Sequence, residues 1–153
     1  LSIDLVKRLF AEFSGVVVGI KDSSGDWENT KALLGIKGLI VYPGAELPVI
    51  DAIRLGAPGC ISATANLNGS DISEVIDLCH AGKWEEAEEK HKKVRAVRLM
   101  FQDYAPIPAQ KALLAKATGN RNWENLRPPM QPMTADKLST LVDHLANQFD
   151  MHF

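Results

Sequence analysis

Hydrophobic residues follow two patterns in the first half of the chain, namely short continuous runs and stripes at helical spacing. The runs end in turn residues, which predicts fully buried strands over residues 16–21, 39–42 and 59–64. The stripes predict helices before and between these strands, with Ser2 and Asp26 as caps and Pro48 in the first turn. An alternation of helices with short apolar strands is typical of βα units around a parallel sheet.

The second half of the chain shows no further strand pattern and is predicted to be helical. Ser70 or Asp71 is expected to begin one helix, and a long helix follows over residues 84–101. One face of the long helix is apolar. The opposite face places Glu and Lys four positions apart, as in Glu86 and Lys90, which predicts ion pairs along a solvated surface.

Three parallel strands with their helices do not close a sheet, and they leave a long unpaired edge of the kind that natural proteins avoid. The first residue is Leu1 rather than methionine. Both observations predict an α/β fold that is the C-terminal part of a TIM (β/α)8 barrel, whose interior needs eight strands to fill. We expect a partial barrel over residues 1–81 and a helical C-terminal domain over residues 82–153.

Composition narrows the class of protein. The 153 residues are 46% hydrophobic and 24% charged, with a net charge of −2, which argues against a nucleic-acid or anionic-membrane surface. No apolar run approaches the roughly 20 residues that cross a bilayer. The two cysteines, Cys60 and Cys79, predict neither a disulfide framework nor a metal site. We therefore expect a cytoplasmic protein with no membrane and no nucleic-acid partner.

The most informative residue is Lys21, which stands where the first predicted strand meets a turn of Asp, Ser, Ser and Gly. The carboxyl ends of parallel strands carry the chemistry of α/β proteins. Apolar surroundings disfavour a charged amine, which makes a neutral nucleophile available near neutral pH. Such an amine can form a Schiff base with a ketone or an aldehyde.

Several segments resemble, in order, the motifs of the dihydrodipicolinate synthase and N-acetylneuraminate lyase family, which consists of pyruvate-handling class I aldolases. They are Gly-Ile-Lys-Asp-Ser-Ser-Gly-Asp at 19–26, Tyr-Pro-Gly-Ala-Glu at 42–46, the segment 56–66 that ends in Ser-x-Thr-x-Asn, and two helical-domain motifs at 108–114 and 127–130. The resemblance implies strands six to eight of a TIM barrel. The family's proton-relaying tyrosine and its pyruvate-carboxylate loop have no counterpart in this chain.

The resemblance implies that Lys21 forms the imine with a keto acid, and that Gly44, Glu46, Ile61 and Ser62 line the substrate site. Each role has a simpler structural alternative. Lys21 could reach solvent from a strand end, and the glycine and small residues could serve tight backbone packing. The carboxylate of Glu46 could bind a polyol substrate or favour the N-terminus of the following helix through its dipole.

The resemblance therefore implies a Schiff-base lyase or aldolase that acts on pyruvate or another 2-keto acid. No metal and no organic cofactor are implied, because the lysine itself supplies the electron sink. The family also implies a homo-oligomer, either a tetramer or a dimer. The alternative is a non-catalytic half barrel that functions only with its missing N-terminal half. A phosphate site on the glycine-containing loops is a weaker third option, because no basic cluster faces them.

Overall fold

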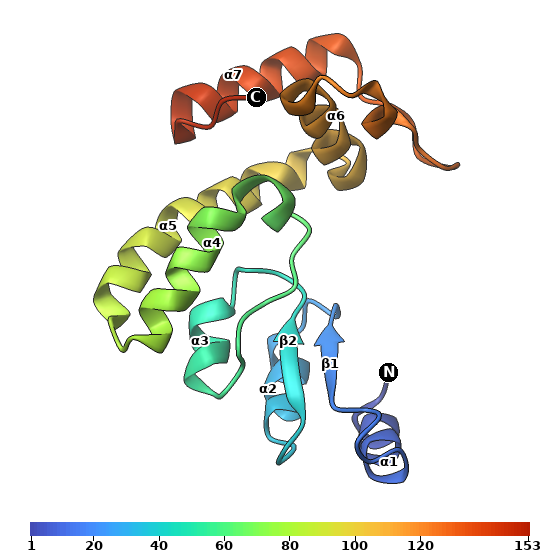
Figure 1. Ribbon diagram of the computed structural model, residues 1–153, viewed down its shortest axis with the longest axis vertical. Coiled ribbons are helices and arrows are strands. Elements are labelled where there is room, and N and C mark those ends of the chain that lie inside the picture. The colour runs from blue at the N-terminus through green and yellow to red at the C-terminus, as the bar shows by residue number, and fades with distance from the viewer.

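The computed structural model describes residues 1–153, which run from a small parallel sheet into a helical C-terminal region (Figure 1). The elements, in chain order, are α1 (Ile3–Glu12), β1 (Gly19–Asp22), α2 (Trp27–Leu34), β2 (Ile40–Pro43), α3 (Val49–Arg54), α4 (Ala65–His80), α5 (Trp84–Met100), the 3-10 turn η1 (Phe101–Asp103), α6 (Pro106–Thr118), the 3-10 turn η2 (Arg121–Glu124) and α7 (Ala135–Phe149). None of the helices combines the length and the apolar character that crossing a membrane takes.

The sheet consists of β1 and β2, which pair in parallel with Gly19 opposite Ile40 and Lys21 opposite Tyr42. The backbones approach closely at the start of this pairing. A Cβ atom on Gly19 would lie 2.5 Å from the carbonyl oxygen of Ile40, so a larger residue there would push the strands apart. The first two predicted strands are therefore confirmed as a parallel pair.

The prediction of a fully buried first strand is wrong for this chain. The strand begins only at Gly19, and the residues before it are exposed, Val16 to 80% and Val18 to 54%. Helices cover one face of the sheet, where Ile20 packs against the cluster that contains Leu33. The other face has no covering layer, so the side chains that alternate toward it meet solvent.

The prediction of a third strand over residues 59–64 is also wrong. This segment is irregular, and a single backbone hydrogen bond joins it to β2, from the Ile61 amide to the Pro43 carbonyl at 3.0 Å. A strand needs a ladder of such bonds to a neighbour. Here β2 supplies one contact, and the chain has no strand on the far side to supply more.

The helix predicted from Ser70 or Asp71 begins earlier, at Ala65. A kink at Asn68, with φ −123° and ψ 34°, divides it into a first turn and a longer second part. The amide of Asn68 donates to the Thr64 carbonyl at 3.0 Å, which holds the first turn. The other predicted caps are confirmed, since Ser2 caps α1 and Asp26 caps α2 through side-chain oxygens.

The long helix α5 packs against α4 along its length (Figure 1). The lysines of α5 do not form the predicted pairs with acids four positions earlier. Lys90 pairs instead with Glu74 of α4, and Lys93 pairs with Asp71 at 3.2 Å. Acidic residues of α4 lie opposite these lysines of α5. The sequence of α5 alone does not reveal these ion pairs between the two helices.

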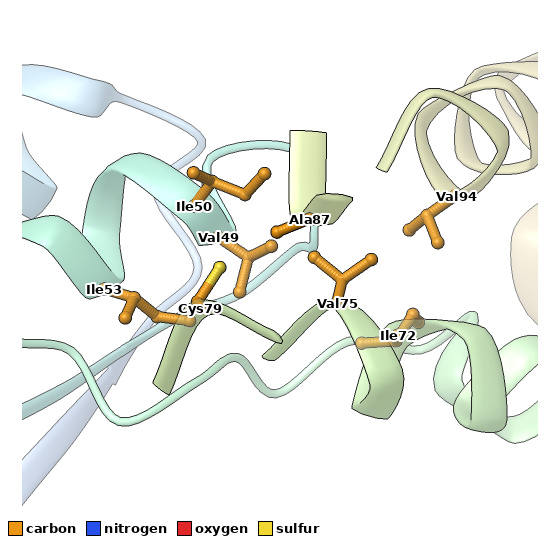
Figure 2. Close-up of a cluster of buried hydrophobic side chains, with 8 residues drawn as sticks. All are labelled: Val49, Ile50, Ile53, Ile72, Val75, Cys79, Ala87 and Val94. Carbon is orange, nitrogen blue, oxygen red and sulfur yellow. The ribbon is translucent and has the colours of Figure 1, made fainter. Parts of the chain in front are cut away.

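Three hydrophobic clusters form the core. The first cluster lies between α1, α2 and β2. The third cluster, near the C-terminus, joins α5, α6 and α7. Figure 2 shows the second, which joins α3, α4 and α5 through Val49, Ile50, Ile53, Ile72, Val75, Cys79, Ala87 and Val94. This cluster packs across the predicted domain boundary between residues 81 and 82. The division into two domains stays a prediction.

Replacement of a leucine in the third cluster should destabilise the protein strongly. Leu113 is fully buried, so Leu113→Ala should lower the free energy of unfolding by about 3 kcal/mol through lost burial and a residual cavity. The matched control is Leu99→Ala on α5, because Leu99 is exposed and should lose well under about 1 kcal/mol. Urea denaturation monitored by circular dichroism measures both. Equal losses in the two variants would contradict this packing.

Candidate active site

Lys21 lies in β1 on the uncovered face of the sheet. Side chains alternate along a strand, and the neighbours Ile20 and Asp22 face the helices. The Lys21 side chain is exposed, with Tyr42 as its register partner on β2. Ile40 on the same face is 44% exposed. The apolar walls that we expected around the amine are therefore only partly supplied by this chain, and the role of Lys21 stays a prediction.

The carboxylate of Asp22 fixes the strand end directly after Lys21. It accepts a hydrogen bond from the Thr30 hydroxyl on α2 at 2.6 Å and another from the Ser24 amide at 3.0 Å. Burial by itself raises the pKa of the Asp22 carboxyl, but these hydrogen bonds together outweigh it and hold that pKa below its ordinary value. The carboxylate thus ties the loop that follows the lysine to α2.

Gly44 lies where the end of β2 meets the end of β1. A Cβ atom at this position would come within 2.6 Å of the Asp22 carbonyl oxygen and within 3.0 Å of the Ser23 Cα atom. Any side chain would have to displace backbone there. The tight-packing alternative therefore accounts for Gly44 in this structure, and a substrate contact at Gly44 remains a proposal.

Glu46 is fully buried, and its carboxylate accepts hydrogen bonds from the hydroxyls of Ser62 and Thr64. These two hydroxyls also lie 3.0 Å apart. The carboxylate thereby joins the turn after β2 to the segment before α4, and both predicted roles of Glu46 stay predictions. Thr64 was not predicted as a site residue. The spacing of Ser62 and Thr64, two apart in an apolar segment, was the available signal.

Ile61 and Ser62 lie beside the end of β2. The Ile61 amide bonds to Pro43, while the Ile61 side chain is 47% exposed. Cys60, next to them, is poorly placed as a nucleophile. Burial, together with the nearby Glu46 carboxylate, raises the pKa of its thiol to about 12. The structure thus brings Gly44, Glu46, Ile61 and Ser62 together around the end of β2.

A pocket of about 400 Å³ opens beside these residues, between the loops after β1 and β2 and helix α5. Its polar lining includes Asp22, Asp26, Asp51, Arg95 and Arg98. Gly44 is the only predicted site residue that borders this pocket. Lys21 does not open into it, because the amine lies on the other face of the sheet.

The model of the dihydrodipicolinate synthetase family matches residues 1–148. The chain belongs to this family. A 4-hydroxy-tetrahydrodipicolinate synthase of Buchnera aphidicola is 32% identical over 132 residues, which are 83% of this chain and 44% of that protein. The corresponding synthase of Methanococcus maripaludis is 29% identical, over 93% of this chain and 48% of its own length.

Solved structures share the fold of this chain. The dihydrodipicolinate synthase of Agrobacterium tumefaciens superimposes with a TM-score of 0.79 at 29% identity, covering 97% of this chain and 49% of that one. The dihydrodipicolinate synthase of Aquifex aeolicus shares the fold at a TM-score of 0.79 and 20% identity, over 98% of this chain and 50% of that one. The chain therefore spans about half the length of the relatives it matches.

Loss of the Thr30 hydroxyl should destabilise this family member in a pH-dependent way. Thr30→Val should lower the free energy of unfolding by about 2 kcal/mol near neutral pH, because a buried carboxylate loses a hydrogen bond. The lowered pKa of Asp22 contributes stability above its ordinary value of 3.8, and this contribution is lost as the pH falls through the folded-state pKa. The difference between variant and wild type should therefore shrink in acid.

Urea unfolding of the Thr30→Val variant at a series of pH values measures this difference. Thr140→Val is the matched control, since its hydroxyl bonds an exposed backbone carbonyl in α7. A Thr30→Val effect that is constant across the acid range would contradict the Asp22 interaction.

Proposed function

We propose that a protein containing this chain is a Schiff-base-forming lyase or aldolase that acts on pyruvate or a related 2-keto acid, with Lys21 forming the imine. The observation that carries the proposal is the position of Lys21 at the end of β1, next to the β2 end where Gly44, Glu46, Ile61 and Ser62 gather. Membership of the dihydrodipicolinate synthetase family supports it. The names of its relatives, which are 4-hydroxy-tetrahydrodipicolinate synthases, support a lyase or synthase reaction.

In the proposed reaction the neutral amine of Lys21 attacks the keto carbon, and the oxygen of the ketone leaves as water. The resulting protonated imine withdraws electrons from the adjacent carbon. A proton or a carbon substituent can then leave that carbon as its bonding pair moves toward the imine nitrogen. Addition of the resulting enamine to an aldehyde forms a carbon–carbon bond, and water releases the product from Lys21. The proposal uses no metal and no organic cofactor.

We place the chain at strands six to eight of a (β/α)8 barrel, followed by the family's helical C-terminal domain. The remaining strands would cover the open face of the sheet, where Lys21 and Ile40 now meet solvent. In such a barrel the amine would gain the apolar walls that lower the pKa of a lysine. We also propose that the protein is cytoplasmic and forms a homo-oligomer. The free thiols of Cys60 and Cys79 agree with the cytoplasmic location.

A second candidate function is that of a non-catalytic half barrel that acts only with a separate N-terminal half. The exposure of Val18, Ile40 and Ile61 favours it, because these residues leave apolar surface without a covering layer. The two candidates share Lys21 and differ in whether the isolated chain binds pyruvate.

Borohydride reduction in the presence of pyruvate should place a single carboxyethyl group on Lys21, because hydride traps the imine as a stable secondary amine. Peptide mass mapping locates the adduct. Lys21→Arg should abolish it, since a guanidinium stays protonated and does not form the imine. Lys37→Arg, in the turn after α2, is the matched control and should retain it. A folded chain that gives no adduct, or adducts spread over many lysines, would assign the chain to the second candidate.

A further inference from the structure

Helix α5 reaches the turn after β2 through two side chains that are one helical turn apart. The Nε2 atom of His91 lies 2.8 Å from the carbonyl oxygen of Glu46. Nη1 of Arg95 donates to the carbonyl oxygen of Leu47 at 2.9 Å. Both bonds span more than forty residues of sequence, so they connect the C-terminal helices directly to the end of the sheet.

Glu46 is held from three directions. Its carbonyl oxygen accepts the Val49 amide at 3.1 Å in addition to the His91 bond. Its carboxylate accepts the hydroxyls of Ser62 and Thr64. Every acceptor group of this residue is engaged within the protein. A shift of the Glu46 backbone would therefore move the carboxylate and, with it, the segment that contains Ile61 and Ser62.

His91 meets this turn as a buried neutral ring. Burial lowers its pKa, and the Arg95 guanidinium acts in the same direction, against the Glu46 hydrogen bond and the Glu46 and Asp51 carboxylates. Since the Glu46 carbonyl can only accept, Nε2 carries the proton. The Nε2–H group is thus a neutral donor on a side chain that is only 6% exposed.

We propose that His91 and Arg95 are positioning residues that clamp the turn after β2 and, through Glu46, hold Ser62 and the Ile61 backbone beside the end of β2. The inference rests on the proposed function in one respect only, namely that these segments border the keto-acid site of Lys21. Neither side chain takes part in the chemistry, because each acts through a backbone carbonyl. The clamp makes the geometry of the substrate site depend on the helical region.

Loss of the His91 donor should weaken pyruvate binding and leave imine formation at saturation unchanged. In His91→Leu, the pyruvate concentration for half-maximal borohydride trapping on Lys21 should rise about tenfold, because the pocket residues lose their fixed positions. His91→Gln keeps a donor near the position of Nε2 and should stay within about threefold of the wild type. His144→Leu, at an exposed position on α7, is the matched control and should change nothing.

Hydrogen exchange provides a readout that does not use pyruvate. The Ile61 amide, bonded to Pro43, should exchange faster in His91→Leu than in His91→Gln, while amides of α6 keep their protection. If His91→Leu does not fold, Arg95→Met tests the same clamp from an exposed residue and should shift both readouts in the same direction by a smaller factor.

Equal effects of His91→Gln and His91→Leu would overturn the proposal, since the ring would then serve packing alone. Unchanged half-saturation and unchanged Ile61 exchange in His91→Leu would also overturn it. A wild-type chain that traps no pyruvate would favour the non-catalytic half barrel without deciding the clamp. In that case the exchange rate of the Ile61 amide decides alone. Faster exchange in His91→Leu but not in His91→Gln would support the clamp, and equal rates in both variants would contradict it.

Discussion

The buried carboxylate of Glu46 is the interaction on which the arrangement of the candidate site depends. A carboxylate withdrawn from water is costly unless its oxygens accept hydrogen bonds, and here the hydroxyls of Ser62 and Thr64 supply them. Apart from this cluster, one backbone hydrogen bond holds the Ile61 segment to β2. The cluster therefore does for this segment what a ladder of strand hydrogen bonds does elsewhere in a sheet.

The end of β1 uses the same kind of interaction on a smaller scale. Asp22, directly after Lys21, accepts the Thr30 hydroxyl and thereby ties the loop to α2. A buried carboxylate thus stands at the end of β1 and another shortly after β2, and the hydroxyl partners of both come from a later segment. Helices α2 and α5 pack in the hydrophobic clusters. The hydrogen bonds of Asp22 and Glu46 therefore fix the residues around Lys21 relative to the core.

Local patterns predicted the strand pair and most helices, because β-branched runs, turn residues and caps act within a few positions of one another. They also predicted that Lys21 stands at a strand end. They failed where a partner is distant or missing, as in the strand expected over residues 59–64, which has one neighbour instead of two. The hydrogen bonds of Glu46 were not predicted for the same reason, since Ser62 and Thr64 lie 16 and 18 residues away. Family motifs brought Glu46 and Ser62 to attention, but only the folded chain shows that they contact each other.

We propose that Lys21 and the Glu46 cluster belong to one keto-acid site. A crystal structure of the chain after borohydride reduction with pyruvate tests it most directly. We predict density that continues from Nζ of Lys21 into a carboxyethyl group lying toward Gly44 and the Ile61 backbone, with the Glu46 carboxylate still bonded to Ser62. An unmodified Lys21, or an adduct that points away from the end of β2, would contradict the claim.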